Sequence, residues 1–231
     1  MNKGTEIIEI AKQVIDDEVE ALIGLKEYID EDFEKIIDII FECKGRLIFT
    51  GIGKSGHISK KISATLSSTG TSSFFMHSTE AFHGDLGMIQ PDDIVVAISY
   101  SGETEDLLKT IPIIKRLGCS VIGVSGNEKS TLSKISDLHQ LIKVEKEACP
   151  LDLAPTSSAT ATLVWGDALA ISLMKKKDFR PEDFAKSHPG GTLGKRLLLS
   201  AKDVMVSGDD LPISKNNESS KDVIKNISEK G

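Results

Sequence analysis

Short runs of β-branched and aromatic residues alternate with longer helical stretches through most of the chain. The runs are RLIFTG, SSFFMH, DIVVAIS, CSVIGVS and LHQLIKVE, which begin at residues 46, 72, 93, 119 and 138. Strands separated by helices favour βαβ units, because two parallel strands need a crossover long enough to hold a helix. The pattern therefore predicts an α/β fold: a doubly wound, flavodoxin-like parallel sheet with helices on both faces.

The segments on either side of this alternation have different patterns. The N-terminal residues predict two helices, since apolar residues such as Ile8 and Ile15 recur at helical spacing. A long apolar stretch after the last run predicts a mostly buried helix with Pro155 in its first turn. We expect an N-terminal helical region, a sheet domain and a polar tail, with boundaries 1–44, 45–200 and 201–231.

Composition excludes several classes of protein. A formal net charge of −7 argues against nucleic acid as a partner, because phosphate-backbone binding needs clustered Lys and Arg. No apolar run approaches the roughly 20 residues that cross a bilayer, so no membrane association is expected. The acidic, amphipathic N-terminus does not resemble a secretion signal, which predicts a cytoplasmic protein.

Two predicted strand ends carry unusual loops, and in open parallel sheets ligands bind beyond the carboxyl ends of the strands. The first loop, FTGIGKSGH from residue 49, has three glycines for tight turning and the hydroxyl of Ser55. Its glycine spacing matches neither the dinucleotide fingerprint nor the P-loop. The loop is either a plain strand-to-helix turn or part of a ligand site.

The second loop, SYSGETED from residue 99, places Ser99, Ser101 and Thr104 where a strand ends and a helix begins. One interpretation is helix capping, with Glu103 and the acids after it facing the positive end of the helix dipole. The other is a phosphate cradle, because three hydroxyls and free backbone N–H groups bind an anion well. The residues alone leave both interpretations open.

Histidines and one glutamate lie near the same predicted edge. His77 and His83 flank STEAF, and with Glu80 they could coordinate zinc or serve as ordinary hydrogen-bonding groups. His188, within SHPGG, is a candidate acid or base. Glu147 follows the last predicted strand, which also brings it to the probable ligand edge.

Several stretches together resemble the sugar isomerase (SIS) family, from about residue 45 to residue 199. The matching stretches are GIGKSGHISKKISATLSSTGT, FFMHSTEAFHGDLGMI, AISYSGET, KVEKEACPLDLAPTSSATATLVWGDALA and DFAKSHPGGTLGKRLL. The resemblance implies reversible conversion of D-ribulose 5-phosphate to D-arabinose 5-phosphate through an enediol, supplying Kdo and lipopolysaccharide biosynthesis. It also implies a homotetramer. No cofactor is required for such a reaction, and no nicotinamide or flavin is needed, since no net redox change occurs.

The resemblance also carries residue roles to matching positions of this sequence. The implied catalytic residues are Lys54, Asp106, Glu147 and His188, and the family commonly has Glu at the position of Asp106. A zinc or other divalent metal ion is possible at His77. The implied substrate- and phosphate-binding residues are Ser55, Gly70, Thr71, His77, His83, Ser99, Ser101 and Thr104.

Two alternatives to this function remain. One is a related isomerase of a longer sugar phosphate, and the other is a non-catalytic sugar-phosphate regulator. The short acidic N-terminal region lacks a basic recognition helix, which argues against the regulator. The tail from residue 201 resembles the start of a CBS module and ends within it, so nucleotide regulation through that module is not expected.

Overall fold

The computed structural model describes residues 3–190 and 200–230, and the chain divides into two compact units, Met1–Phe184 and Ala185–Gly231. Each unit is described by itself. The strands are β1 (Leu47–Gly51), β2 (Ser73–His77), β3 (Ile94–Ile98), β4 (Ser120–Ser125) and β5 (Leu138–Leu141). The longer helices of the first unit are α1 (Lys3–Leu25), α2 (Glu31–Glu42), α3 (Gly53–Ser68), α5 (Glu105–Arg116) and α7 (Ser157–Lys176).

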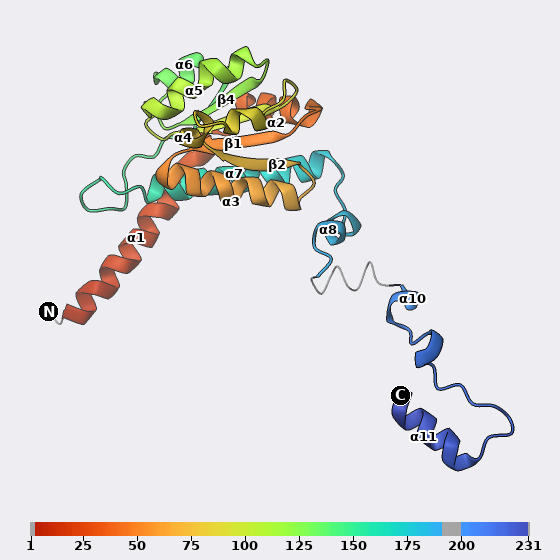
Figure 1. The fold of residues 1–231 in the computed structure, drawn as a ribbon. Coiled ribbons are helices and arrows are strands. Elements are labelled where there is room, and N and C mark those ends of the chain that lie inside the picture. Colours follow the sequence, from red (N-terminus) through yellow and green to blue (C-terminus); the bar gives the residue numbers. More distant parts are fainter. Residues whose placement is uncertain (1–2, 191–199, 231) are drawn as a thin grey trace. The chain divides into compact units, whose positions relative to one another are not determined.

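The five strands form one parallel sheet in the order β2-β1-β3-β4-β5 (Figure 1). This is the flavodoxin-like order, so the predicted fold class is confirmed. From β1 the chain continues to β2 at one edge of the sheet, whereas from β3 it continues through β4 to β5 at the opposite edge. The crevice between the carboxyl ends of β1 and β3 is therefore the topological switch point, where such sheets bind ligands.

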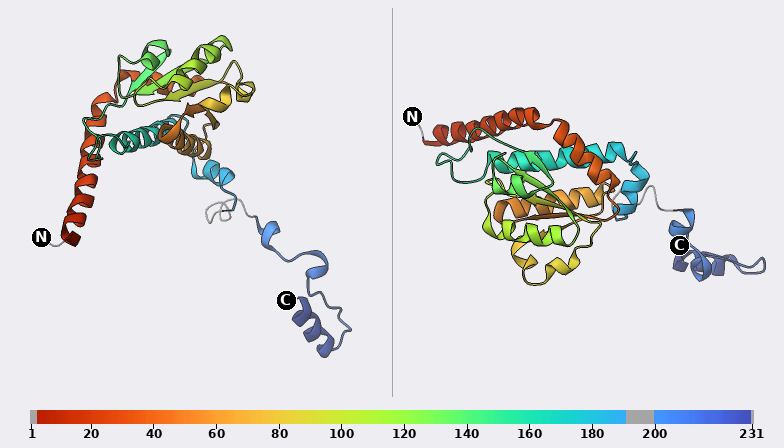
Figure 2. Two further views of the ribbon diagram at one scale, coloured as in Figure 1. Left: turned by 60° about the vertical axis from the view of Figure 1, so that its left-hand side comes forward. Right: turned by 90° about the horizontal axis from the view of Figure 1, so that it is seen from above.

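Both faces of the sheet are covered by helices (Figures 1 and 2). In β1, Phe49 packs with Trp165 of α7 on one face, whereas Ile48 packs with Ile111 of α5 on the other. Successive strand residues point to opposite faces, and every β1 residue is buried. Burial on both faces explains why the strands are continuous apolar runs rather than alternating ones.

Short elements complete the first unit and join the strands. They are η1 (Lys26–Tyr28), α4 (Ser78–Ala81), η2 (Asp85–Met88) and α6 (Thr131–Ile135). Gly70 and Gly118 follow α3 and α5 with φ of 88° and 95°, in the left-handed region that glycine adopts at helix ends. The prediction for Pro155 is wrong by two residues: Thr156 is the N-cap of α7, whose first turn begins at Ser157.

An ion pair between half-buried Arg46 and buried Asp93 fixes the amino ends of β1 and β3. The Asp93 side chain is almost fully buried, and its carboxylate accepts hydrogen bonds from the Arg46 backbone at 2.7 Å and the Arg46 guanidinium at 2.9 Å. The Gln90 backbone N–H donates to the same carboxylate at 2.8 Å. Because each partner satisfies the other, the pair holds the two strands in register and so aligns their carboxyl ends.

Helix α1 packs against α7 on one side, where the Thr160 hydroxyl donates to the Glu18 carboxylate at 3.0 Å. Its other side leaves Ile8, Ile15, Val19 and Ile23 between 48% and 63% exposed. No helix in the described part of the chain has the length and apolar character needed to cross a membrane.

Helix α8 (Pro181–Ser187) crosses the boundary between the units. The elements after it are α10 (Ala201–Val204), η3 (Gly208–Asp210) and α11 (Ser220–Lys230). Helix α10 begins with a capping box between Ser200 and Asp203. The described residues after position 200 are almost all exposed, as the polar composition of the tail predicts.

Candidate active site

The two unusual loops meet at the switch point. In the sheet register, Gly51 of β1 pairs with Ile98 of β3 on one side and with His77 of β2 on the other. A Cβ placed on Gly51 would lie 3.0 Å from the Ile98 carbonyl oxygen and 3.3 Å from the Gly56 nitrogen. Glycine therefore allows the first loop to turn closely beside the end of β3.

Ser99 is the centre of a hydroxyl cluster in the second loop. Its hydroxyl is 2.8 Å from the Thr104 hydroxyl and 3.5 Å from the Ser101 hydroxyl, and it accepts from the Gly102 backbone N–H at 3.1 Å. Gly102 has φ of 69°, a conformation that lets the loop fold back on Ser99. Ser99 is buried, whereas Ser101 is exposed and Thr104 is half-buried. We call Ser99–Thr104 the cradle.

The geometry of Thr104 decides between capping and cradle. Thr104 is the N-cap residue of α5, yet its side chain accepts no hydrogen bond from the helix backbone. Its hydroxyl instead faces Ser99. Ordinary capping therefore does not explain the three hydroxyls, and the N-terminal N–H groups of α5 are not taken up by the Thr104 side chain. This arrangement favours the anion-binding interpretation.

The acids of the loop point to different partners. The Glu103 carboxylate accepts from the Thr131 backbone N–H at 2.7 Å, and this bond holds the pKa of Glu103 below its usual value. The interpretation of Glu103 as a dipole partner of α5 is therefore wrong, because it caps α6 instead. Glu105 pairs with Lys109 at 2.6 Å. Asp106 is exposed in the first turn of α5, and its carboxylate forms no ion pair or hydrogen bond with a described residue.

Lys54 and Ser55 lie in the first turn of α3, at the same sheet edge as the cradle. Gly53 before them has φ of 58°, which sets the sharp entry into the helix. The Lys54 side chain is exposed and forms no ion pair within the described residues, and Ser55 is half-buried. A cation and a hydroxyl at a helix N-terminus suit binding of an anionic or polarised oxygen.

Glu147 is held at the N-terminus of α7. One carboxylate oxygen accepts from the Thr156 backbone N–H at 2.7 Å, the Thr156 hydroxyl at 3.0 Å and the Ser158 backbone N–H at 3.2 Å. Burial raises the pKa of Glu147, but the hydrogen bonds from Ser158 and Thr156 outweigh burial, so its pKa lies below the ordinary value. The group is an oriented carboxylate at neutral pH.

A cavity of about 260 Å³ connects Glu147 with the loop that contains the cradle. Tyr100, which directly follows Ser99, and Glu147 both line this cavity, together with Val144 and Asp152. Neither Tyr100 nor Thr156 is predicted as a site residue from the sequence. The only signal for Tyr100 is an aromatic residue inside an otherwise small and polar loop.

His77 is the last residue of β2 and the N-cap of α4. Its Nδ1 accepts from the Thr79 backbone N–H at 3.3 Å, and its ring packs edge-on to Phe75. Among residues 3–190 and 200–230, no three His, Cys, Asp or Glu side chains gather closely enough to hold a metal ion. His77 thus offers one ligand, and of the two alternatives for these residues, the zinc set of His77, His83 and Glu80 does not form among the described residues. His83 lies after α4 and is exposed.

The structure does not bring Gly70 and Thr71 to the cradle. Both precede β2, so they lie at the amino edge of the sheet, whereas the cradle is at the carboxyl edge. Lys177 at the end of α7 donates to the Thr71 hydroxyl at 2.8 Å and to the Gly70 carbonyl at 3.1 Å. Gly70 and Thr71 therefore have a structural role in this unit: they join the end of α3 to the end of α7.

His188 belongs to the second unit, just after α8. Its backbone N–H donates to the Ala185 carbonyl at 3.1 Å. Its role as a catalytic acid or base stays a prediction.

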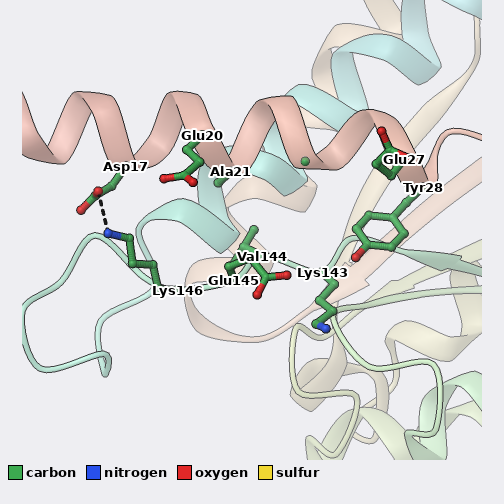
Figure 3. Close-up of a pocket in the computed structure, with 10 residues that line it drawn as sticks. Asp17, Glu20, Ala21, Glu27, Tyr28, Lys143, Val144, Glu145 and Lys146 are labelled. Carbon is green, nitrogen blue, oxygen red and sulfur yellow. Dashed lines mark ion pairs between the residues drawn. The ribbon is translucent and has the colours of Figure 1, made fainter.

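A second cavity, of about 480 Å³, lies between α1 and residues 143–146 (Figure 3). Lys146 pairs with Asp17 of α1 at 2.8 Å across its rim. Tyr28 of η1 and Lys143, which follows β5, also line it. The ion pair attaches the segment before Glu147 to the N-terminal helix.

The sheet order and the cradle define the class: a doubly wound α/β protein with a hydroxyl-rich loop at its switch point. The SIS domain model matches residues 39–172. The chain belongs to the SIS domain family.

Known relatives and solved structures show which members of the family this chain is similar to. The chain is 50% identical to arabinose 5-phosphate isomerase KdsD of Yersinia pestis and 47% identical to that of Shigella flexneri, over 100% of this chain and 70% of each relative. Among solved structures, Escherichia coli CFT073 c3406 in complex with arabinose 5-phosphate is 42% identical, with a TM-score of 0.79. That match covers 82% of this chain and 100% of the other.

Proposed function

We propose that this chain is an arabinose 5-phosphate isomerase that interconverts D-ribulose 5-phosphate and D-arabinose 5-phosphate, with the product supplying Kdo and lipopolysaccharide biosynthesis. The observation that carries the proposal is the 47–50% identity to KdsD proteins over the whole chain. The cradle at the switch point supports it physically, because a sugar phosphate needs an anion site that fixes one end of the substrate.

Ser55, Ser99, Ser101 and Thr104 bind the phosphate group in this proposal. Their hydroxyls, with the N–H groups at the starts of α3 and α5, provide neutral donors for a dianion. The Glu103 carboxylate does not oppose phosphate binding in this proposal, because it is turned to the start of α6.

The sugar end of the substrate then reaches the groups that move a proton. Isomerisation removes the proton from the carbon beside the carbonyl, passes through an enediol and returns a proton to the neighbouring carbon. Glu147 or His188 serves as the base for both transfers. Lys54 stabilises the negative charge that develops on the oxygen, and Asp106 faces the sugar hydroxyls. No net redox change occurs.

An isomerase assay with ribulose 5-phosphate in deuterium oxide tests this proposal. Active protein should form arabinose 5-phosphate and incorporate deuterium at C2, and Glu147→Gln and His188→Ala should both reduce exchange. Full exchange in both variants contradicts the assignment of the base. Conversion of sedoheptulose 7-phosphate instead would indicate an isomerase of longer sugars, and binding without turnover would indicate a regulator.

We also propose that His77 can bind zinc or another divalent ion as a single protein ligand, with water or substrate oxygens completing the coordination. Because the described residues offer no further clustered ligands, no step of the reaction is assigned to the metal. Zinc titration of the protein and of His77→Ala, followed by calorimetry, tests this directly. Equal zinc affinity in both proteins contradicts it.

A homotetramer is the proposed assembly. The exposed apolar side chains of α1, including Ile8 and Ile15, together with Ile171 of α7 provide a surface that association would remove from water. Light scattering tests this, and a monomer at micromolar concentration contradicts it. Three free cysteines support a reducing compartment such as the cytoplasm.

A further inference from the structure

We propose that Tyr100 is a positioning residue that fixes the segment carrying Glu147 relative to the phosphate cradle. This inference rests on the proposed function, in which the cradle binds phosphate and Glu147 moves a proton. It concerns a residue within SYSGETED to which the sequence patterns assign no role.

The contact joins two loops that are far apart in sequence. The Tyr100 hydroxyl oxygen accepts from the Val144 backbone N–H at 3.1 Å and donates to the Val144 carbonyl oxygen at 3.5 Å. Tyr100 immediately follows Ser99, the centre of the cradle, and Val144 lies shortly before Glu147. The hydroxyl therefore ties the exit of β3 to the segment after β5.

The tyrosine itself is held in place from the other side. The Gly126 backbone N–H donates to the Tyr100 carbonyl at 2.8 Å. A Cβ on Gly126 would lie 2.4 Å from Cε2 of the Tyr100 ring, so the ring packs directly on the glycine main chain. The side chain is half-buried. The ring is therefore held against Gly126, the residue after β4. Because the Tyr100 hydroxyl is bonded to the main chain of Val144, the position of the ring sets the position of Val144.

The other attachments of the segment after Val144 lie outside the sheet, and they include the three hydrogen bonds from Thr156 and Ser158 to the Glu147 carboxylate. Lys146 pairs with Asp17 of α1 (Figure 3). The Glu147 backbone N–H donates to Asp152 within its own loop. Among the described contacts of residues 144–147, the Tyr100 hydroxyl is the one side-chain group of the cradle loop that forms hydrogen bonds with the segment.

The chemistry of Tyr100 suits positioning rather than proton transfer. Burial raises the pKa of Tyr100, and the hydrogen bond with Val144 only partly opposes this, so the hydroxyl keeps its proton. Its donor and its acceptor are both directed to main-chain groups. A positioned base must lie within hydrogen-bond reach of the carbon acid, and a displacement of about 1 Å can cost on the order of 100-fold in rate.

Tyr100→Phe tests the proposal, because it removes the hydroxyl and keeps the ring. Tyr28→Phe is the matched control: it is the other tyrosine of the chain, and its hydroxyl forms no hydrogen bond to a described residue. We expect Tyr100→Phe to lower kcat by about tenfold or more with KM within about threefold, since the cradle remains. Tyr28→Phe should match the wild type in both constants.

Hydrogen–deuterium exchange provides a second readout that does not depend on activity. Backbone amides of residues 144–148 should exchange faster in Tyr100→Phe than in the wild type and in Tyr28→Phe. The acid limb of the kcat profile should also move to higher pH, because a displaced Glu147 loses donors that lower its pKa.

The outcomes separate the two proposals. If the wild type does not interconvert the pentose phosphates, the proposed function fails, while amide exchange still decides whether Tyr100 holds the segment. If the wild type is active and Tyr100→Phe matches it in kcat and exchange, the positioning role is overturned. If Tyr100→Phe does not fold, Gly126→Ala displaces the ring with its hydroxyl retained, and an unchanged kcat in that variant overturns the proposal.

Discussion

The hydroxyl oxygens of Ser99 and Thr104 lie 2.8 Å apart, although Thr104 stands at the N-cap of α5. At that position a threonine ordinarily accepts a hydrogen bond from its own helix. The pair instead joins the end of β3 to the start of α5 through side chains alone. It keeps two hydroxyls together at the switch point and leaves the helix N–H groups free of a side-chain cap at Thr104.

Thr104→Val should weaken substrate binding with little loss of stability. The substitution keeps the shape of the side chain and removes a hydroxyl proposed to contact the phosphate. A hydrogen bond to a charged group contributes about 1.5–3 kcal/mol, which corresponds to a KM increase of about tenfold or more. Thr65→Val, at a half-buried position of α3 outside the cradle, is the control for steady-state kinetics. An unchanged KM in Thr104→Val contradicts the cradle assignment.

Gly102→Ala should destabilise the protein, whereas Gly87→Ala should not. Gly102 has φ of 69°, and a Cβ there would lie 2.3 Å from the Ser130 side chain; Gly87 has no atom within 4 Å of such a Cβ. The left-handed conformation alone costs about 1–2 kcal/mol for a residue with a Cβ. Thermal unfolding should show a fall in Tm of about 2–8 °C for Gly102→Ala. Equal Tm values for the two variants would show that the loop relaxes freely.

Glu147 should contribute stability that depends on pH. Because hydrogen bonds hold its pKa below the ordinary 4.5, the ionised group stabilises the folded state above that pH. This contribution is lost as the pH falls through the lowered folded-state pKa. The Tm difference between wild type and Glu147→Gln should therefore shrink from about pH 6 to about pH 3.5. Glu145→Gln, at an exposed neighbour, is the control for the loss of one carboxylate.

Position 106 should tolerate the longer carboxylate of glutamate but not the neutral amide of asparagine. It is exposed in the first turn of α5, and its carboxylate has no partner among the described residues, so its charge is available to a ligand. Asp106→Asn should lower kcat by about tenfold or more, and Asp106→Glu should keep it within about threefold. Equal kcat in Asp106→Asn and the wild type removes Asp106 from the catalytic residues. Circular dichroism serves to confirm that both variants fold.

Much of the fold could be predicted from local patterns. The ends of the strands followed from apolar runs that stop at Gly51, His77 and Ser99, and glycines at 70 and 118 marked helix ends. The sequence pattern places Pro155 in the first turn of α7, whereas the helix begins at Ser157. In the structure the Glu147 carboxylate accepts a hydrogen bond from the backbone N–H of Thr156, the N-cap residue. That contact depends on a loop conformation that propensities do not encode.

The sequence by itself determined the alternation of strands and helices, and with it the carboxyl edge at which hydroxyl-rich loops meet. Only the tertiary structure decided which partners the loop residues take. Glu103 caps α6 rather than α5, Tyr100 binds Val144, and Thr71 lies at the far edge against Lys177. The physical reason is that periodicity and propensity act between near neighbours, whereas these contacts arise from the order and register of strands that are distant along the chain.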